Sequence, residues 1–143
     1  MSGAEEDIMR EIKFRAWSKL LNKMLSHEDL NKTLKDLTKI EYIAGIFLPL
    51  NSDVEVMQYT GLKDKNGKEI YEGDIVKFLD EVNHSHYGVE YDEFINIGKV
   101  IFSHDELIGW DITNRKMDLN EVWHYREYIE VIGNIYENPE SLG

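Results

Sequence analysis

Apolar and polar residues alternate along much of this chain, whereas one segment repeats its apolar residues at helical spacing. In residues 11–17, Ile12, Phe14 and Ala16 alternate with polar and basic residues. Successive side chains of a β-strand point to opposite faces, so this pattern predicts a half-buried strand.

Residues 26–40 carry the helical spacing. Ser26 can accept a hydrogen bond from the first backbone N–H groups of a helix, and two acidic residues follow where the helix dipole favours them. Leu30, Leu34 and Leu37 then recur at helical intervals. The segment is therefore predicted to be one amphipathic helix whose apolar stripe packs on the core.

Short strand patterns separated by turn signals fill the rest of the chain. Asn66 and Gly67 predict the two-residue turn of a hairpin, because both residue types tolerate a positive φ. Residues 72–74 predict a second turn. Residues 117–128 show only a possible short helical turn. Strands are predicted at residues 54–59, 70–71, 75–79, 97–102, 106–113 and 129–136.

These elements together predict a mainly β protein. Short strands at close spacing are typical of a small barrel, and the turn-to-strand step at residues 72–76 also occurs in SH3-like barrels. A polar break after Pro49 gives the best internal boundary. We expect a disordered lead-in at residues 1–10, an N-terminal strand and helix at residues 11–50, and a barrel-like, strand-rich part at residues 51–143 that forms one folded unit with them.

Composition narrows the class of protein. The 143 residues suit one domain, and the 42% hydrophobic content can form an ordinary core without metal or disulfides. There is no cysteine, which excludes disulfides, thiolate zinc sites and cysteine nucleophiles. Residues 1–7 lack the features of a signal peptide, and the longest apolar stretch, residues 42–50, is too short to cross a bilayer. We expect a cytoplasmic protein that does not associate with membranes.

The net charge of −12 is carried entirely by the second part of the chain. Residues 1–50 hold equal numbers of acidic and basic residues, whereas residues 51–143 hold 20 acidic and 8 basic ones. Residues 78–98 include five acidic side chains and no Lys or Arg. Such a surface repels phosphate backbones, so nucleic-acid binding is disfavoured.

Three segments, in order, carry a family resemblance. They are KFRAW at residues 13–17, QYTGLKDKNGKEIYEGDIV at residues 58–76 and EVIGNIYENPE at residues 130–140. The combination resembles the YopX family of bacteriophage and prophage proteins, although Ser18 stands where an acidic residue usually follows. The resemblance implies a largely β protein of phage type in a bacterial host, with no assigned activity, cofactor or catalytic residue to carry over.

One set of residues has the spacing of a metal site. His84, His86, Glu90 and Asp92 occupy alternate positions, so in a strand they would share one face. A His-x-His pair with a carboxylate can bind one metal ion. We favour the simpler interpretation of an exposed polar strand face, because Gly88 interrupts the pattern and such matches often arise by chance. We therefore assign no metal or cofactor.

The other histidines have simpler explanations than catalysis. Residues 104–106, His-Asp-Glu, could supply a general base with an acidic partner, but such a triplet more often forms a turn. His124 is predicted to be a packed or surface residue, and His27 to lie just inside the helix start.

No sequence motif points to an enzyme. The chain has no Gly-x-Ser-x-Gly nucleophile motif and no phosphate-binding loop of the Walker type. Its three tryptophans could stack on nucleic-acid bases, but core packing suits so acidic a chain better. They are Trp17, Trp110 and Trp123.

Three functions follow as hypotheses. The leading one is a non-enzymatic binding or regulatory module that contacts an unidentified protein or a second copy of itself. The second is an acidic nucleic-acid mimic, in which the carboxylates of residues 80–130 contact a host DNA-binding protein. The third is a metal-dependent hydrolase that uses residues 84–92. The module requires an exposed apolar patch, the mimic a contiguous carboxylate face, and the hydrolase histidines and acids that converge on a cleft.

Overall fold

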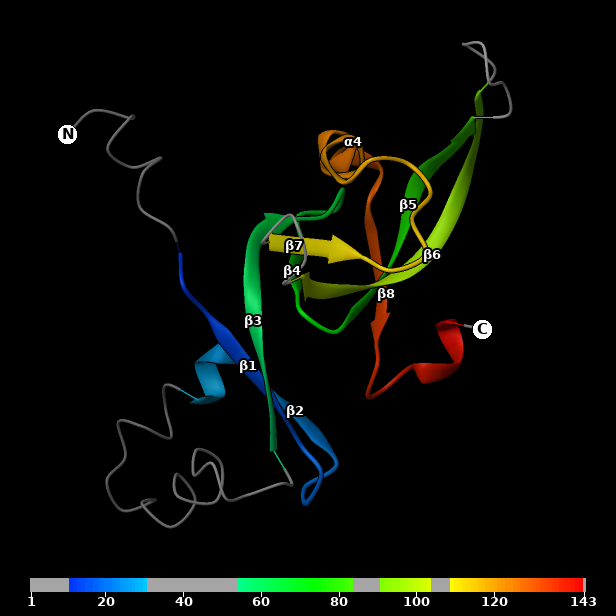
Figure 1. Cartoon of the computed structure of the whole chain (residues 1–143). Coiled ribbons are helices and arrows are strands. Elements are labelled where there is room, and N and C mark those ends of the chain that lie inside the picture. The colour runs from blue at the N-terminus through cyan, green and yellow to red at the C-terminus, as the bar shows by residue number, and fades with distance from the viewer. Residues whose placement is uncertain (1–10, 31–53, 84–90, 104–108, 143) are drawn as a thin grey trace, which may run out of the picture. The chain divides into compact units, whose positions relative to one another are not determined.

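The computed structural model describes residues 11–30, 54–83, 91–103 and 109–142 (Figure 1). The chain divides into two compact units, one ending at Gly61 and the other beginning at Leu62. Most described residues lie in strands of two antiparallel sheets, which confirms the mainly β prediction. The domain boundary predicted at residue 50 lies outside the described ranges and stays a prediction.

Within the described residues, the first unit contains two strands and most of a third. β1 (Phe14–Ser18) pairs antiparallel with β2 (Lys23–Leu25) on one side and with β3 (Val54–Lys63) on the other. The predicted strand at residues 11–17 therefore begins later than expected. Ile12 precedes the paired residues and is 66% exposed, whereas Ala16 lies between both neighbours and is fully buried.

The predicted helix begins where its capping signal lies. The Ser26 hydroxyl accepts a hydrogen bond from the backbone N–H of Asp29, and the Asp29 carboxylate accepts one from the N–H of Ser26, each at 3.1 Å. This reciprocal pair is a capping box, and residues 27–30 are helical. Leu30 packs with Ala16 and Leu25 in the core of the first unit. The rest of the predicted helix, residues 31–40, lies outside the described residues.

The turn predicted at Asn66 and Gly67 is present but is one residue longer. It connects β3 to β4 (Glu69–Tyr71), its neighbour in the sheet order β2-β1-β3-β4. The backbone N–H of Gly67 donates to the carbonyl oxygen of Asp64 at 3.0 Å. The backbone N–H of Asp64 donates to the carbonyl oxygen of Lys68 at 2.8 Å. Gly67 has φ 80°. The loop is thus a three-residue turn that ends in a left-handed glycine.

The second unit contains a curved sheet in the order β7-β6-β5-β8, a half-barrel. Within the described residues, β8 pairs with the start of β5 and β7 pairs with the end of β6. In the described part of the chain, residues 78–83 and 91–96 therefore pair as strands with each other alone. We call these residues the ribbon, which extends past the neighbouring strands (Figure 1). The strands are β5 (Asp74–Asn83), β6 (Tyr91–Ser103), β7 (Gly109–Ile112) and β8 (Glu130–Asn134).

One face of this sheet carries the larger core. Val76 and Phe78 from β5 pack there with Val100 from β6, and Val122 covers them from α4 (Leu119–His124). In residues 117–128, where the sequence indicated no more than a possible short helical turn, α4 is followed by the 3-10 helix η2 (Arg126–Tyr128). The described chain ends in a second 3-10 helix, η3 (Pro139–Leu142).

Candidate functional site

Most of the residues weighed as candidate metal ligands lie outside the described ranges. Only Asp92 is described, on β6, where its side chain is exposed. Within the described ranges, no three His, Cys, Asp or Glu side chains are arranged to hold a metal ion. The favoured interpretation of an exposed polar strand face therefore stays a prediction, and the metal site stays its untested alternative. The residues outside are His84, His86, Glu90 and the triplet at 104–106.

The two described histidines occupy the predicted places. His27 is the first residue of the helical segment that follows Ser26. His124 ends α4 with an exposed side chain, and its ring meets that of Tyr125 edge-on, with centroids 5.1 Å apart. Both positions fit a structural role.

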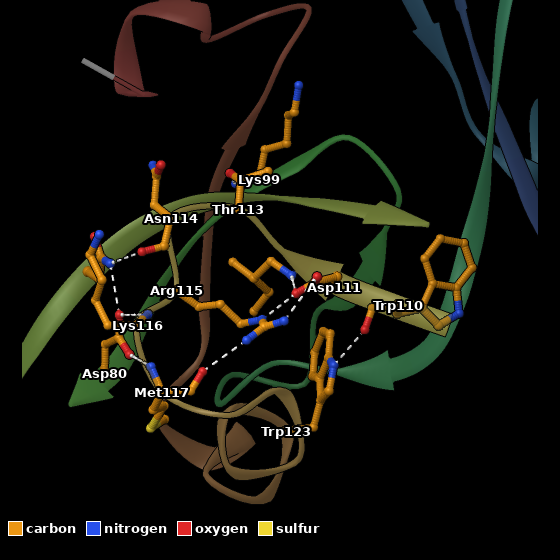
Figure 2. A network of polar contacts seen from close by, with 12 residues as sticks. Asp80, Lys99, Trp110, Asp111, Thr113, Asn114, Arg115, Lys116, Met117 and Trp123 are labelled. Carbon is orange, nitrogen blue, oxygen red and sulfur yellow. Dashed lines mark hydrogen bonds and ion pairs between the residues drawn. The ribbon is translucent and has the colours of Figure 1, made fainter. Parts of the chain in front are cut away.

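The tryptophans serve packing, as expected. Trp17 is buried in the first unit, and Trp110 and Trp123 are half-buried against the core of the second. The indole N–H of Trp123 donates to the carbonyl oxygen of Trp110 at 2.8 Å (Figure 2). The ring of Phe102 meets that of Trp110 edge-on at 5.1 Å. These contacts fix both indole rings against the core of the second unit.

A fully buried carboxylate organises the polar network of the second unit (Figure 2). Asp80 lies on β5 and accepts four hydrogen bonds. Its Oδ1 accepts from the backbone N–H groups of Met117 and Glu81, both at 2.9 Å. Its Oδ2 accepts from the backbone N–H of Lys116 at 2.8 Å and from the side-chain amide of Asn96 at 2.9 Å. The residue thereby joins the ribbon to the segment that leads into α4.

The protonation state of Asp80 follows from these contacts. Burial alone would raise its pKa, but the hydrogen bonds from Asn96, Met117 and Lys116 outweigh burial, so the pKa is lowered. The carboxylate is therefore ionised at neutral pH, and each of its oxygens already has two donors. A general base needs an oxygen that can reach a substrate proton. Asp80 acts instead as a structural clamp.

Neighbouring amides extend the clamp. The side-chain amide of Asn96 also donates to the backbone carbonyl oxygen of Asn114 at 2.9 Å. The side-chain amide of Asn114 donates in turn to the backbone carbonyl oxygen of Ile97 at 3.2 Å. Asn114 has φ 68°, in the left-handed region that asparagine tolerates better than most residues. These bonds hold the chain reversal after β7 against β6.

An ion pair braces the same segment. The Nε of Arg115 lies 2.6 Å from Oδ1 of Asp111, and its Nη1 donates to the carbonyl oxygen of Met117 at 3.0 Å (Figure 2). The hydrogen bond that Arg115 donates to Asp111 is the main reason that the pKa of Arg115 is raised. This arginine is thus committed to the scaffold rather than to a ligand.

A second buried carboxylate closes the edge strand β8. Oδ2 of Asp64 accepts from the backbone N–H of Val131 at 2.9 Å, and Oδ1 accepts from those of Asn66 and Lys68 at 2.8 and 2.9 Å. Burial would raise the pKa of Asp64, but these three bonds lower it overall. Asp64 therefore fixes the turn before β4 and occupies a backbone donor on the edge strand β8.

The ribbon face opposite Asp80 has a different character. Glu81 stands directly opposite Glu93 in the β5–β6 register, and Leu79 stands opposite Ile95. Because side chains alternate along a strand, these four point away from Asp80. The Ile95 side chain is 59% exposed and Glu93 is exposed, while Leu79 and Glu81 are half-buried. We call these four side chains the outer face.

Sequence reasoning missed both features, for different reasons. Asp80 had a usable signal, since it continues the alternation of Val76 and Phe78 and so puts an acid at a core-facing position. The pairing of Glu81 with Glu93 had none, because it depends on the register of two strands and not on spacing along one.

No helix in the described part of the chain is long and apolar enough to span a bilayer.

Comparisons with known proteins identify relatives of this architecture. The family model described as YopX protein matches residues 13–143. The crystal structure of protein EF1440 from Enterococcus faecalis is similar at a TM-score of 0.54, with 24% sequence identity, over 94% of this chain and 100% of that chain. At that identity the likeness supports the fold alone. No curated protein matches the chain significantly.

Proposed function

The chain belongs to the YopX family, and from this and the site geometry we propose that it is a non-enzymatic binding module that acts through contacts with another protein. The observation that carries the proposal is the contrast between the two faces of the ribbon. One face is fixed by a saturated buried carboxylate, whereas the other exposes Ile95 beside two glutamates.

The described interior offers scaffolding rather than catalysis. Asp64 and Asp80 are buried and ionised, and fixed backbone donors occupy both oxygens of each. Arg115 is likewise engaged by Asp111. An acid–base catalyst must exchange protons with its substrate, which these groups cannot do without breaking the fold around them. Their arrangement supports a rigid surface for recognition.

An acidic nucleic-acid mimic is the second candidate. It is supported by the charge of residues 78–98, which contain five acidic side chains and no Lys or Arg. A mimic would bind a basic DNA-binding protein with an affinity that falls steeply as salt rises. The hydrolase hypothesis depends mainly on His84, His86 and Glu90, which lie outside the described residues, so it stays a prediction.

Affinity capture tests the proposal. The full chain, tagged and incubated with a bacterial lysate, should enrich a defined protein over an unrelated bait of equal net charge. A module with an apolar contact should retain its partner at high salt, whereas a mimic should release a basic protein. Failure to enrich any protein over the control bait would contradict both candidates.

A further inference from the structure

We propose that the outer face of the ribbon binds a partner-protein segment in which a Lys or Arg is flanked by apolar residues. This inference rests on the proposed function and names its surface and the chemistry of its ligand. The outer face consists of Leu79 and Glu81 on β5 and of Glu93 and Ile95 on β6.

The β5–β6 register places Glu81 and Glu93 directly opposite each other. Residues directly opposite on antiparallel strands have Cβ atoms about 4.5–5.5 Å apart, and like charges in such a pair are destabilising. Within the described ranges, neither Glu81 nor Glu93 forms a side-chain ion pair. The ribbon thus holds two adjacent carboxylates that a single bound cation would neutralise together.

The flanking pair defines the rest of the ligand. Leu79 and Ile95 form the next cross-strand pair on the same face, two residues from the glutamates on each strand. More than half of Ile95 is exposed. Covering it would remove apolar surface from water, which is favourable at about 25 cal/mol per Å². A matching segment therefore places an apolar side chain on this pair and a Lys or Arg on the glutamates.

Rigidity favours binding at this face. The opposite side of the ribbon is held by Asp80 through Asn96, Lys116 and Met117, so a ligand would not have to order these strands. Preorganisation of this kind lowers the entropic cost of association.

Charge excludes two other occupants. Phosphate groups of a nucleic acid would meet Glu81 and Glu93 with the same sign of charge. A second copy of the chain that used the same face would bring its own two glutamates into the interface. Complementarity therefore favours a segment of a different protein that carries positive charge.

The test uses the full chain, isotopically labelled, and a synthetic peptide that alternates Lys with Ile. In an NMR titration, amide signals of residues 79–81 and 93–95 should shift and saturate. The double variant Glu81→Gln, Glu93→Gln should weaken binding about tenfold. The matched variant Glu121→Gln, Glu127→Gln removes the same charge from exposed positions on α4 and η2 and should change affinity less than about twofold.

A second pair of variants tests the apolar contact. Ile95→Thr should weaken peptide binding, whereas Ile12→Thr, at a comparably exposed isoleucine of the first unit, should not. Equal effects of the two double variants would show diffuse attraction and overturn the inference. So would absence of peptide binding, shifts confined to other residues, or self-association that Ile95→Thr abolishes.

Failure of this inference can be told apart from failure of the proposed function. If lysate capture still enriches a partner and the partner is retained equally by Ile95→Thr and the Glu81, Glu93 double variant, the module binds elsewhere and only the inference falls. If capture enriches no partner, the proposed function falls as well.

Discussion

The carboxylate of Asp80 accepts a 2.9 Å hydrogen bond from the backbone N–H of Met117, thirty-seven residues further along the chain. The same carboxylate also binds the N–H of Lys116 and the amide of Asn96, so one buried charge connects β5, β6 and the segment before α4. The fold of the second unit therefore depends on a polar contact as well as on its apolar core.

Replacing Asp80 by Asn should be strongly destabilising. Asn has nearly the same shape but has no charge and presents an N–H₂ group to at least one of the backbone donors. Hydrogen bonds to charged groups contribute about 1.5–3 kcal/mol, so we expect the free energy of unfolding to fall by about 2–4 kcal/mol. Urea unfolding followed by circular dichroism measures it. Glu121→Gln, at an exposed position, is the control and should be neutral.

Acid should unfold the protein for the same reason. The folded-state pKa values of Asp64 and Asp80 lie below 3.8, the ordinary value for an aspartate side chain. The unfolded chain therefore binds protons more readily, and stability is fully present above about pH 4 and is lost as pH falls through the lowered values. Urea midpoints measured between about pH 6 and pH 2 should fall in the acid range. An unchanged midpoint throughout would contradict the assigned contacts.

Local chemistry explains which elements the sequence could predict. The capping pair of Ser26 and Asp29 and the left-handed Gly67 act within a few residues, so their signals stand in the sequence itself. The length of the turn before β4 was mispredicted, because it is set by Asp64, whose carboxylate also reaches Val131 across the second unit. A contact of that range leaves no local pattern.

Gly67 allows a direct test of the turn. Its φ of 80° strains a residue with a branched side chain, while no atom lies within 4 Å of an added Cβ. Gly67→Val should therefore lower the free energy of unfolding by about 1–3 kcal/mol through backbone strain alone. Gly67→Asn should cost less, because asparagine tolerates this region. Thermal melts that rank the two variants equally would show that strain at this position is not the cause.

Gly98 should respond to a different constraint. A Cβ there would lie 2.1 Å from the carbonyl oxygen of Thr113 and 2.8 Å from Cγ2 of Ile112. The oxygen belongs to the backbone, which pairs with Lys99, so it cannot move aside easily. We expect Gly98→Ala to cost about 3 kcal/mol. Gly61→Ala, at positive φ but in open space, should cost about 1 kcal/mol, and urea unfolding should separate the two.

The candidate surface could not have been derived from spacing along the chain. The acidic bias of residues 78–98 is visible in the sequence, but their distribution over two faces depends on the β5–β6 register. In that register Asp80 stands opposite Phe94 and its carboxylate accepts a hydrogen bond from Asn96, two residues further along β6, whereas Glu81 stands opposite Glu93. Neighbouring acids of similar sequence context thus have opposite roles, one as a buried clamp and one on an exposed face.

The pair of Glu81 and Glu93 gives the last prediction, in which stability and binding change in opposite directions. Glu93→Lys replaces a like-charge pair by an opposite-charge pair directly across the two strands. Cross-strand pairs of this kind contribute about 0.2–1 kcal/mol, so the free energy of unfolding should rise by that order. Binding of the Lys–Ile peptide should be lost, because the added ammonium repels the ligand and occupies Glu81. Glu127→Lys makes the same change of charge on η2 and should leave peptide binding nearly unchanged. Raising the salt concentration should reduce the stability gain, since ions screen exposed charges within about 8–10 Å. A Glu93→Lys variant that was less stable than the wild type, or that still bound the peptide, would contradict the register on which the outer face depends.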